Sequence, residues 1–143
     1  MNGERLRTRL SNAARSPGIT ALSHHSAAHL HGLVDRPPHL IHVLALRGSH
    51  PARLPDVIVH HTRALDSSSV VHIDGLPVTD VPSTVVMMAA YNTPDETKAM
   101  IRAAIATSLT LEELRTVAEQ RRRRGRAGPS QLLTVLTSPD IAC

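Results

Sequence analysis

Histidine is the residue whose number and spacing most suggest chemistry, since ten histidines occur among 143 residues. His25 and His29 are four residues apart, a spacing at which two imidazoles on one helix can hold a zinc ion. His60, His61 and His72 fall in two strand-like runs and could meet if those strands paired. However, the His-Glu-x-x-His pattern is absent, and simple alternation along strands explains the second group equally well. We therefore expect solvated or structural histidines and no metal site.

The adjacent Ser23 and His24 are a second candidate for chemistry. Nucleophilic catalysis needs a third orienting group and an oxyanion site besides the serine and its base, and the sequence indicates neither. Ser23 is better explained as the N-cap of a helix, and no glycine-rich phosphate loop is present. We expect no catalytic residue and no cofactor, and hence a protein that is not an enzyme.

Positive charge is concentrated at the two flanks of the sequence, although the net charge is only +4. Residues 1–15 carry four arginines and one glutamate, and residues 115–126 carry six arginines and one glutamate, whereas residues 16–114 carry six basic and nine acidic groups. Arginine clusters neutralise phosphates and release counterions. The second flank therefore either contacts the phosphate backbone of nucleic acid or is a solvated linker after a helix. The candidate nucleic-acid contacts are Arg121, Arg122, Arg123, Arg124 and Arg126, together with Arg5, Arg7 and Arg9 if the two flanks meet in space.

Aromatic side chains are almost absent, because Tyr91 stands alone and there is no phenylalanine or tryptophan. The core must therefore be built from Leu, Val, Ile, Ala and Met. Single-stranded nucleic acid is commonly bound on aromatic stacking platforms, and the composition argues against such a platform here.

The composition also indicates a compartment. The single cysteine, Cys143, allows no internal disulfide, as is usual in a reducing cytosol. The basic N-terminal residues are not followed by the apolar segment of a signal peptide, and no apolar run is long enough to span a membrane. We expect a cytoplasmic protein with no membrane partner.

Apolar spacing predicts helices, then strands, then helices again. Helices are expected over residues 3–14, 24–33, 84–90, 95–106, 111–123 and 130–137. Strands are expected over residues 40–46, 57–62, 70–73 and 76–79. Asp74-Gly75 predicts a hairpin turn, and Thr110 to Glu113 predicts a capping box. Gly125 and Gly128 are expected to end the helix before them, within a basic linker near residues 121–128.

This order of elements predicts an α+β fold. We expect a single domain over residues 1–143, with a small antiparallel sheet flanked by N-terminal helices and a C-terminal helical segment.

Several short segments occur in an order and spacing typical of a known family. Residues 22–33 read Leu-Ser-His-His-Ser-Ala-Ala-His-Leu-His-Gly-Leu, and residues 74–79 read Asp-Gly-Leu-Pro-Val-Thr. A Val-x-x-His segment begins at Val57, and a Thr-x-x-Glu-Leu segment spans residues 110–114. Over about residues 18–126, the chain resembles the central domain of AbiEi-family antitoxins of type IV toxin–antitoxin systems.

The resemblance implies a function. Antitoxins of this family repress their own operon through a winged-helix module and counteract a nucleotidyltransferase toxin. It therefore implies a non-enzymatic, antitoxin-like or transcription-regulator-like protein of a toxin–antitoxin or phage-defence system. The expected partners are DNA and a nucleotidyltransferase-type toxin.

Two kinds of departure separate this chain from the family pattern. Ser83 and Met87 stand where proteins of the AbiEi family usually have an arginine and an aspartate, so both members of this polar pair are replaced. About fifteen residues precede the resembling region, too few for a winged helix, and no nuclease-like segment follows it. We expect the central domain alone. The alternatives are an accessory DNA-binding protein that uses the C-terminal arginine cluster, or a truncated remnant without independent function.

Overall fold

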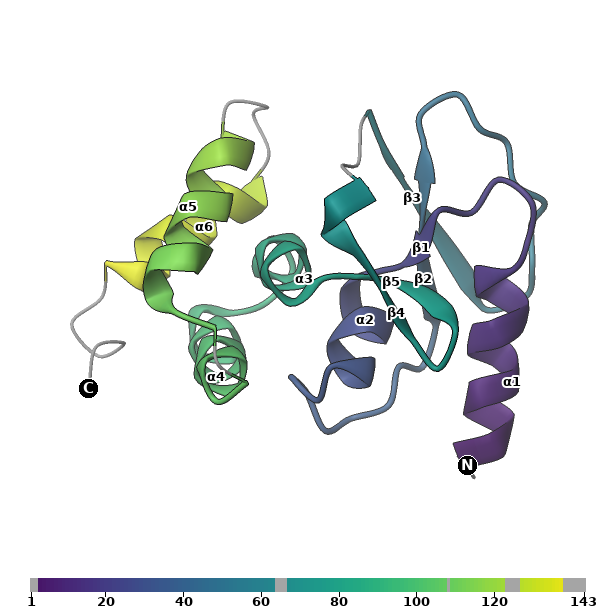
Figure 1. Ribbon diagram of the computed structural model, residues 1–143, viewed down its shortest axis with the longest axis horizontal. Helices are drawn as coiled ribbons and strands as arrows, with labels where there is room; N and C mark the ends of the chain where they lie inside the picture. Colours follow the sequence, from purple (N-terminus) through teal and green to yellow (C-terminus); the bar gives the residue numbers. More distant parts are fainter. Residues whose placement is uncertain (1–2, 64–66, 108, 123–126, 138–143) are drawn as a thin grey trace.

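The chain forms two parts that lie side by side along the long axis of the molecule (Figure 1). The computed structural model describes residues 3–63, 67–107, 109–122 and 127–137. The first part, here called the sheet half, contains a five-stranded sheet with α1 (Gly3–Ala14) and α2 (His24–Leu30). The second, the helical half, contains the remaining α-helices of the described residues, none of which is long and apolar enough to cross a membrane. These helices are α3 (Val81–Ala89), α4 (Pro94–Ile105), α5 (Leu111–Arg122) and α6 (Ala127–Leu136).

The sheet is mixed, so the α+β class is confirmed but the predicted antiparallel sheet is wrong. Its strands are β1 (Ala21–Leu22), β2 (Ile41–Leu46), β3 (Val57–Thr62), β4 (Val70–Ile73) and β5 (Leu76–Thr79), in the order β3-β2-β1-β5-β4. The pairs β1–β2 and β4–β5 are antiparallel, whereas β2–β3 and β1–β5 are parallel. The loop after β2 returns along the sheet, so that Val57 pairs with Ile41 instead of Leu46. A parallel pair needs such a crossover.

The central strand, β1, was not expected at all. It has two residues, Ala21 and Leu22, both fully buried. Two residues are too few to show the alternation that marks a strand in a sequence. The predicted hairpin at Asp74-Gly75 is confirmed, because both residues have positive φ, 51° and 80°, as the tight turn requires.

The helix ends confirm some predicted caps and correct others. Thr110 accepts a hydrogen bond from the Glu113 amide (3.1 Å), as expected. A full capping box, with both reciprocal bonds, joins Thr93 and Glu96 at the start of α4. Ser23 occupies the N-cap position of α2, but its side chain makes no capping bond.

The last helix begins earlier than predicted. It runs over Ala127–Leu136, so Gly128 opens α6 instead of ending α5, and Ser130 is not its cap. A Cβ on Gly128 would stand 2.4 Å from the Val86 carbonyl oxygen, so glycine is what lets α6 approach α3. The predicted basic linker is correspondingly shorter. Arg121 and Arg122 belong to α5, and residues 123–126 lie outside the described residues.

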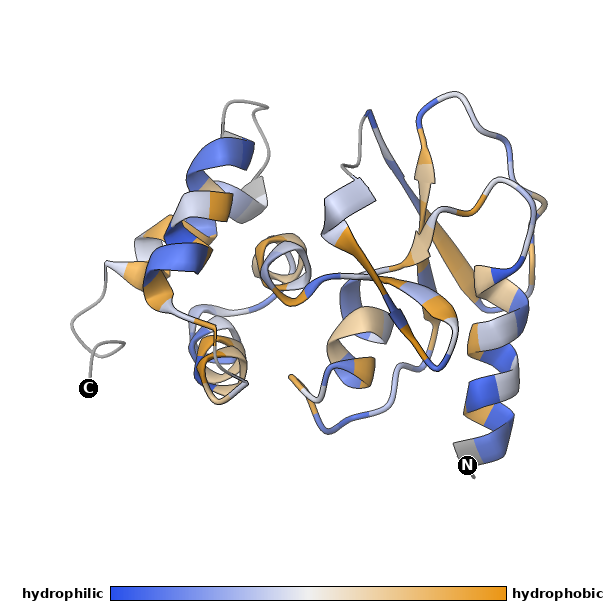
Figure 2. Ribbon diagram, in the orientation of Figure 1, coloured by the Kyte–Doolittle hydropathy of each residue, from blue (hydrophilic) through white to orange (hydrophobic). Residues whose placement is uncertain are grey.

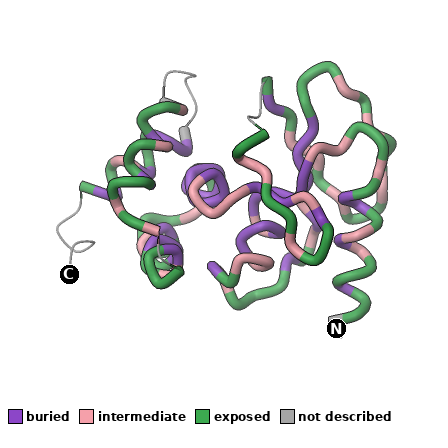
Figure 3. Tube along the Cα trace, viewed as in Figure 1, coloured by how far each residue is buried: buried purple, intermediate pink, exposed green. Residues whose placement is uncertain are grey.

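Two apolar clusters form the core, one in each half (Figures 2 and 3). In the sheet half, Leu6 and Leu10 of α1 pack with Leu22, Ile41 and Val43 of the strands. The helical cluster is centred on side chains of α3 to α6. Its largest fully buried members are Val85, Met100, Ile101, Leu114 and Leu132. As expected, aliphatic residues and methionine build both clusters, and Tyr91 is 67% exposed.

Candidate functional site

Histidines from three elements come together where the sheet meets the helical half. His42 on β2 and His60 on β3 are brought close by the parallel pairing of these strands. The His42 Nδ1 and His60 Nε2 atoms are 3.0 Å apart, a hydrogen-bond distance. The ring of His24, at the start of α2, stacks on the ring of His60 with centroids 3.7 Å apart and planes 16° apart. We call these residues the histidine stack.

His24 reaches this position only in an unusual backbone conformation. Its φ is +52°, in the left-handed region, which costs a residue with a side chain about 1–2 kcal/mol. Its Nδ1 lies 2.7 Å from the Ser23 hydroxyl, and both residues are buried. Ser23 therefore orients the imidazole instead of capping the helix. Strain of this kind concentrates at functional sites, so the stack marks a candidate site.

The stack is uncharged at neutral pH. Burial, and then the neighbouring His60, lowers the pKa of His24 to about 3. Burial, with His60 as the next cause, lowers the pKa of His42 to about 4. The pKa of His60 is lowered by burial and then by His61. A neutral imidazole has one donor and one acceptor nitrogen, so His42 and His60 can bond to each other without repulsion.

A cleft of about 570 Å³ opens beside the stack, between the sheet half and the helical half. His24 and His60 line it on one side, and Val86 and Met87 of α3 line it on the other. Tyr91 is also in its wall and stands edge-on to both imidazoles, 5.6 Å from His24 and 6.1 Å from His60 between centroids. The cleft therefore combines aromatic, apolar and polar walls, as small-molecule sites generally do.

A guanidinium completes the cleft. Arg121, near the end of α5, lines it and donates a hydrogen bond from Nη2 to the buried Ser83 hydroxyl (2.9 Å). Ser83 and Met87 lie one helical turn apart on α3, and an arginine side chain from another helix stands beside the buried Ser83 hydroxyl.

The predicted arginine contacts do not come together. Among the described arginine side chains, Arg121 alone lines the cleft. Arg122 is in α5, with a side chain outside the described part of the chain, and Arg123, Arg124 and Arg126 lie wholly outside it. Arg5, Arg7 and Arg9 are on α1, at the opposite end of the long axis from α5 (Figure 1). Among the described side chains, Arg121 therefore shares no surface with Arg5, Arg7 and Arg9.

The predicted histidine groupings do not form either. His72 is on β4 and His60 on β3, at opposite edges of the sheet. His25 Nε2 bonds to the Arg36 carbonyl oxygen (3.0 Å), and His29 Nδ1 is buried without a hydrogen-bond partner. Within the described ranges no three potential ligands are placed to hold a metal ion.

The residues that do meet, His24, His42, His60 and Tyr91, were missed by sequence reasoning. They are distant in the sequence and share no spacing. The one local signal is that His42 and His60 both fall in strand-like runs, and such runs can pair. Pairing of these two runs depends on the crossover loop, which no local pattern shows.

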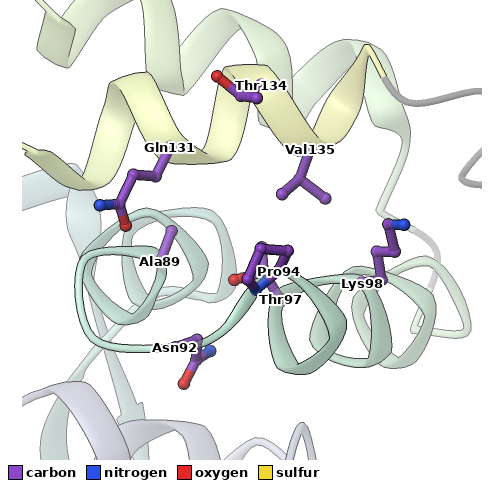
Figure 4. Close-up of a pocket in the computed structure, with 8 residues that line it drawn as sticks. All are labelled: Ala89, Asn92, Pro94, Thr97, Lys98, Gln131, Thr134 and Val135. Carbon is purple, nitrogen blue, oxygen red and sulfur yellow. The ribbon is translucent and has the colours of Figure 1, made fainter.

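A second cavity, of about 450 Å³, lies within the helical half (Figure 4). Gln131 and Val135 of α6 face Ala89, Pro94 and Thr97 across it, and Lys98 stands at one end. Its walls are hydroxyl, amide and methyl groups with a single cation. It lacks the aromatic side chains and the buried titratable groups of the histidine cleft.

Comparisons with known proteins inform the fold only. No protein-family model matches the sequence, and no curated protein does. Among solved structures, the chain is similar to the RV2827C protein from Mycobacterium tuberculosis, with a TM-score of 0.59 and 20% sequence identity. The match covers 95% of this chain and 54% of that protein, so the chain spans about half the length of its structural neighbour.

Proposed function

We propose that the protein is a non-enzymatic, antitoxin-like binding protein of a type IV toxin–antitoxin or phage-defence system. The observation that carries the proposal is the meeting of the two family-like segments. Leu22, in the first segment, pairs with Val78, in the second, at the centre of the sheet. His31 Nε2 donates a hydrogen bond to the Thr79 carbonyl oxygen (2.7 Å) and joins the segments again.

These contacts support the resemblance because two segments separated by about forty residues of chain serve one structural purpose. The first segment supplies β1 and α2, and the second supplies the hairpin turn and β5. A chance similarity of two short motifs would not require them to touch. The pairing of the two segments therefore supports the proposal that they belong to one family scaffold.

Co-expression with a nucleotidyltransferase-type toxin from the same genome tests the proposal. The protein is expected to restore growth of cells that express the toxin. A Val78→Asp variant, which places a charge at a fully buried position, should not restore growth. Continued growth arrest with the unaltered protein, present in soluble form, contradicts the antitoxin role.

A second candidate function is DNA binding through the C-terminal arginine cluster. It is favoured by the position of Arg121 in the wall of the cleft between the two halves and by the six arginines of residues 115–126. A gel-shift series over salt concentration tests it, since phosphate contacts weaken steeply as salt rises. Replacing Arg121 to Arg124 by alanine should abolish the shift, and replacing Arg5, Arg7 and Arg9 at the other end should not. A remnant without function predicts neither growth rescue nor a gel shift.

A further inference from the structure

We propose that the histidine cleft binds one unpaired nucleotide, with its base against Tyr91 and His60 and its phosphate toward Arg121. The chemistry is a nucleobase joined to a phosphate. Its source is either a free mononucleotide or an unpaired base in a nucleic-acid strand. This inference goes beyond the antitoxin proposal and does not depend on it.

The lone aromatic residue, Tyr91, lies in the wall of the cleft. A chain with one tyrosine and no phenylalanine or tryptophan would gain most stability by burying that ring, because aromatic side chains bury the largest apolar area. Instead Tyr91 is 67% exposed, at the wall of the cleft. The ring is thus placed where a ligand can reach it. Unstacked bases are commonly held on tyrosine and histidine rings.

The imidazoles of the histidine stack, beside Tyr91, are uncharged at neutral pH. His60 is partly exposed, and His24 supports one face of its ring at 3.7 Å. Neutral imidazoles offer a flat surface together with donor and acceptor nitrogens. The edges of nucleobases also present donors and acceptors side by side. The stack is therefore suited to an uncharged, planar, hydrogen-bonding group.

A positive charge lies in the wall of the same cleft. Arg121 is the cation among the described residues of the cleft wall, and it comes from α5 of the helical half, whereas His60 is on β3 of the sheet half. Its bond to Ser83 holds the guanidinium in place, and a guanidinium presents several donors in a fixed fork that fits phosphate oxygens. A volume of about 570 Å³ is ample for one nucleotide.

Other cavities fit this ligand less well. A cavity of about 420 Å³ beside α1 is lined by Arg7, Arg15 and His29, but also by Asp74, and by no tyrosine. A cavity of about 680 Å³ is lined by His50, His61 and Arg53, again without a tyrosine. The cavity in Figure 4 has Lys98 but no aromatic wall. Tyr91, stacked imidazoles and a guanidinium occur together in the histidine cleft.

Isothermal titration calorimetry with AMP, adenosine, inorganic phosphate and a single-stranded oligoadenylate tests the proposal. AMP or the oligoadenylate should bind at least about 10-fold more tightly than adenosine or phosphate alone, because both parts of the nucleotide are recognised. Binding by AMP assigns a free nucleotide as the source. Binding by the oligoadenylate alone assigns a strand.

Two pairs of variants locate the binding. Tyr91→Ala should weaken it by about 5- to 150-fold, the range for loss of one stacked base, and Tyr91→Phe should leave it within about 2-fold. Arg121→Met should weaken binding of the nucleotide more than that of adenosine, whereas Arg115→Met, on an exposed part of the same helix, should leave both unchanged. Because Tyr91 and Arg115 are exposed, variants at these positions are expected to fold, and circular dichroism checks this for them and for Arg121→Met.

The proposal is overturned if neither AMP nor the oligoadenylate binds, if inorganic phosphate binds as tightly as they do, or if Tyr91→Ala leaves their affinity unchanged. A protein that rescues cells from the toxin but binds no nucleotide would lose this proposal and keep the antitoxin role. A protein that binds AMP or the oligoadenylate but does not rescue cells from the toxin would keep this proposal and lose the antitoxin role.

Discussion

The sheet half and the helical half differ in what they bury. The helical half buries mainly aliphatic side chains and methionine along regular apolar faces. The sheet half has a similar apolar cluster, but it also buries the imidazole of His24 and half-buries that of His42, at the side that faces the helices. Hydrogen bonds to Ser23 and His60 offset the cost of burying these polar groups, but His24 is held there in a left-handed backbone conformation. The helical half is therefore built around apolar packing, whereas the junction carries a strained residue of the kind that concentrates at functional sites.

The largest expected effect comes from the core of the helical half. Leu132→Ala removes a fully buried side chain of α6 and should lower the free energy of unfolding by about 2–5 kcal/mol. Leu133→Ala, at a partly buried neighbouring position, is the matched control and should cost less. Urea denaturation measures both. Equal costs would mean that α6 does not pack as described.

Unfolding measurements also test how strongly the sheet half and the helical half are coupled. Ala28 and Leu33, from the sheet half, belong to the helical cluster. Both halves should therefore unfold in one transition. Separate transitions for Tyr91 fluorescence and for far-ultraviolet circular dichroism would show two independent halves instead.

A slightly smaller effect is expected from the approach of α6 to α3. Gly128→Ala places a Cβ 2.4 Å from the Val86 carbonyl oxygen, a backbone atom that no side-chain rotation can move away. The expected cost is about 3 kcal/mol, at the upper end for overpacking. Ser130→Ala, exposed in the same helix, should change stability by less than about 0.5 kcal/mol. Thermal unfolding compares them, and similar melting temperatures would contradict the close approach.

The buried histidines of the sheet half predict sensitivity to acid. The folded-state pKa of His24 is depressed to about 3 from the ordinary histidine value of 6.5, so the unfolded state binds more protons between these values. Stability from this group is therefore complete above about pH 6.5 and falls as the pH drops toward about 3. From about pH 7 to about pH 5 the loss from His24 is about 2 kcal/mol.

Denaturation at a series of pH values measures this loss. A His24→Asn variant, whose side chain tolerates the left-handed backbone, should flatten the pH dependence. A variant at the exposed His39, such as His39→Gln, should not. A pH dependence that is the same in His24→Asn as in the unaltered protein would mean that the stack is not buried as described.

The smallest effect concerns the N-terminal end of α4. Thr93→Ala removes the hydroxyl that accepts from the Glu96 amide and breaks the capping box of α4. The expected cost is about 1 kcal/mol, and Thr93→Ser should recover most of it. Chemical denaturation resolves this difference. A cost as large as that of Leu132→Ala would make the ends of the helices, and not their core, the source of stability in this half.

The two halves also differ in how far the sequence predicts them. The apolar spacing of Leu114, Val117 and Ala118 and the cap at Thr110 are local signals, and they place α5 within one residue of its observed ends. Strands β2 to β5 are likewise recognisable from their own residues. The antiparallel sheet was wrong because its order depends on the two-residue β1 and on the crossover between β2 and β3, which no local pattern reveals.

The candidate site was largely unpredictable for the same physical reason. His42 approaches His60 because of the strand register, and His24 reaches both through a strained backbone. Arg121 was one of eight arginines predicted to contact nucleic acid, and it is the one among their described side chains that lines the cleft. The expectation that no aromatic platform exists counted tyrosine alone and did not include imidazoles stacked beside it.

The central claim is that the cleft between the halves, and not the basic end at α1, is where this protein binds its ligand. Backbone amide nuclear magnetic resonance spectra recorded during a titration with AMP or oligoadenylate test it most directly. We predict chemical-shift changes concentrated at His60, Met87, Tyr91 and Arg121, with α1 unchanged. Changes centred on Arg7 and Arg15, or no changes at the cleft at saturating ligand, would contradict the account.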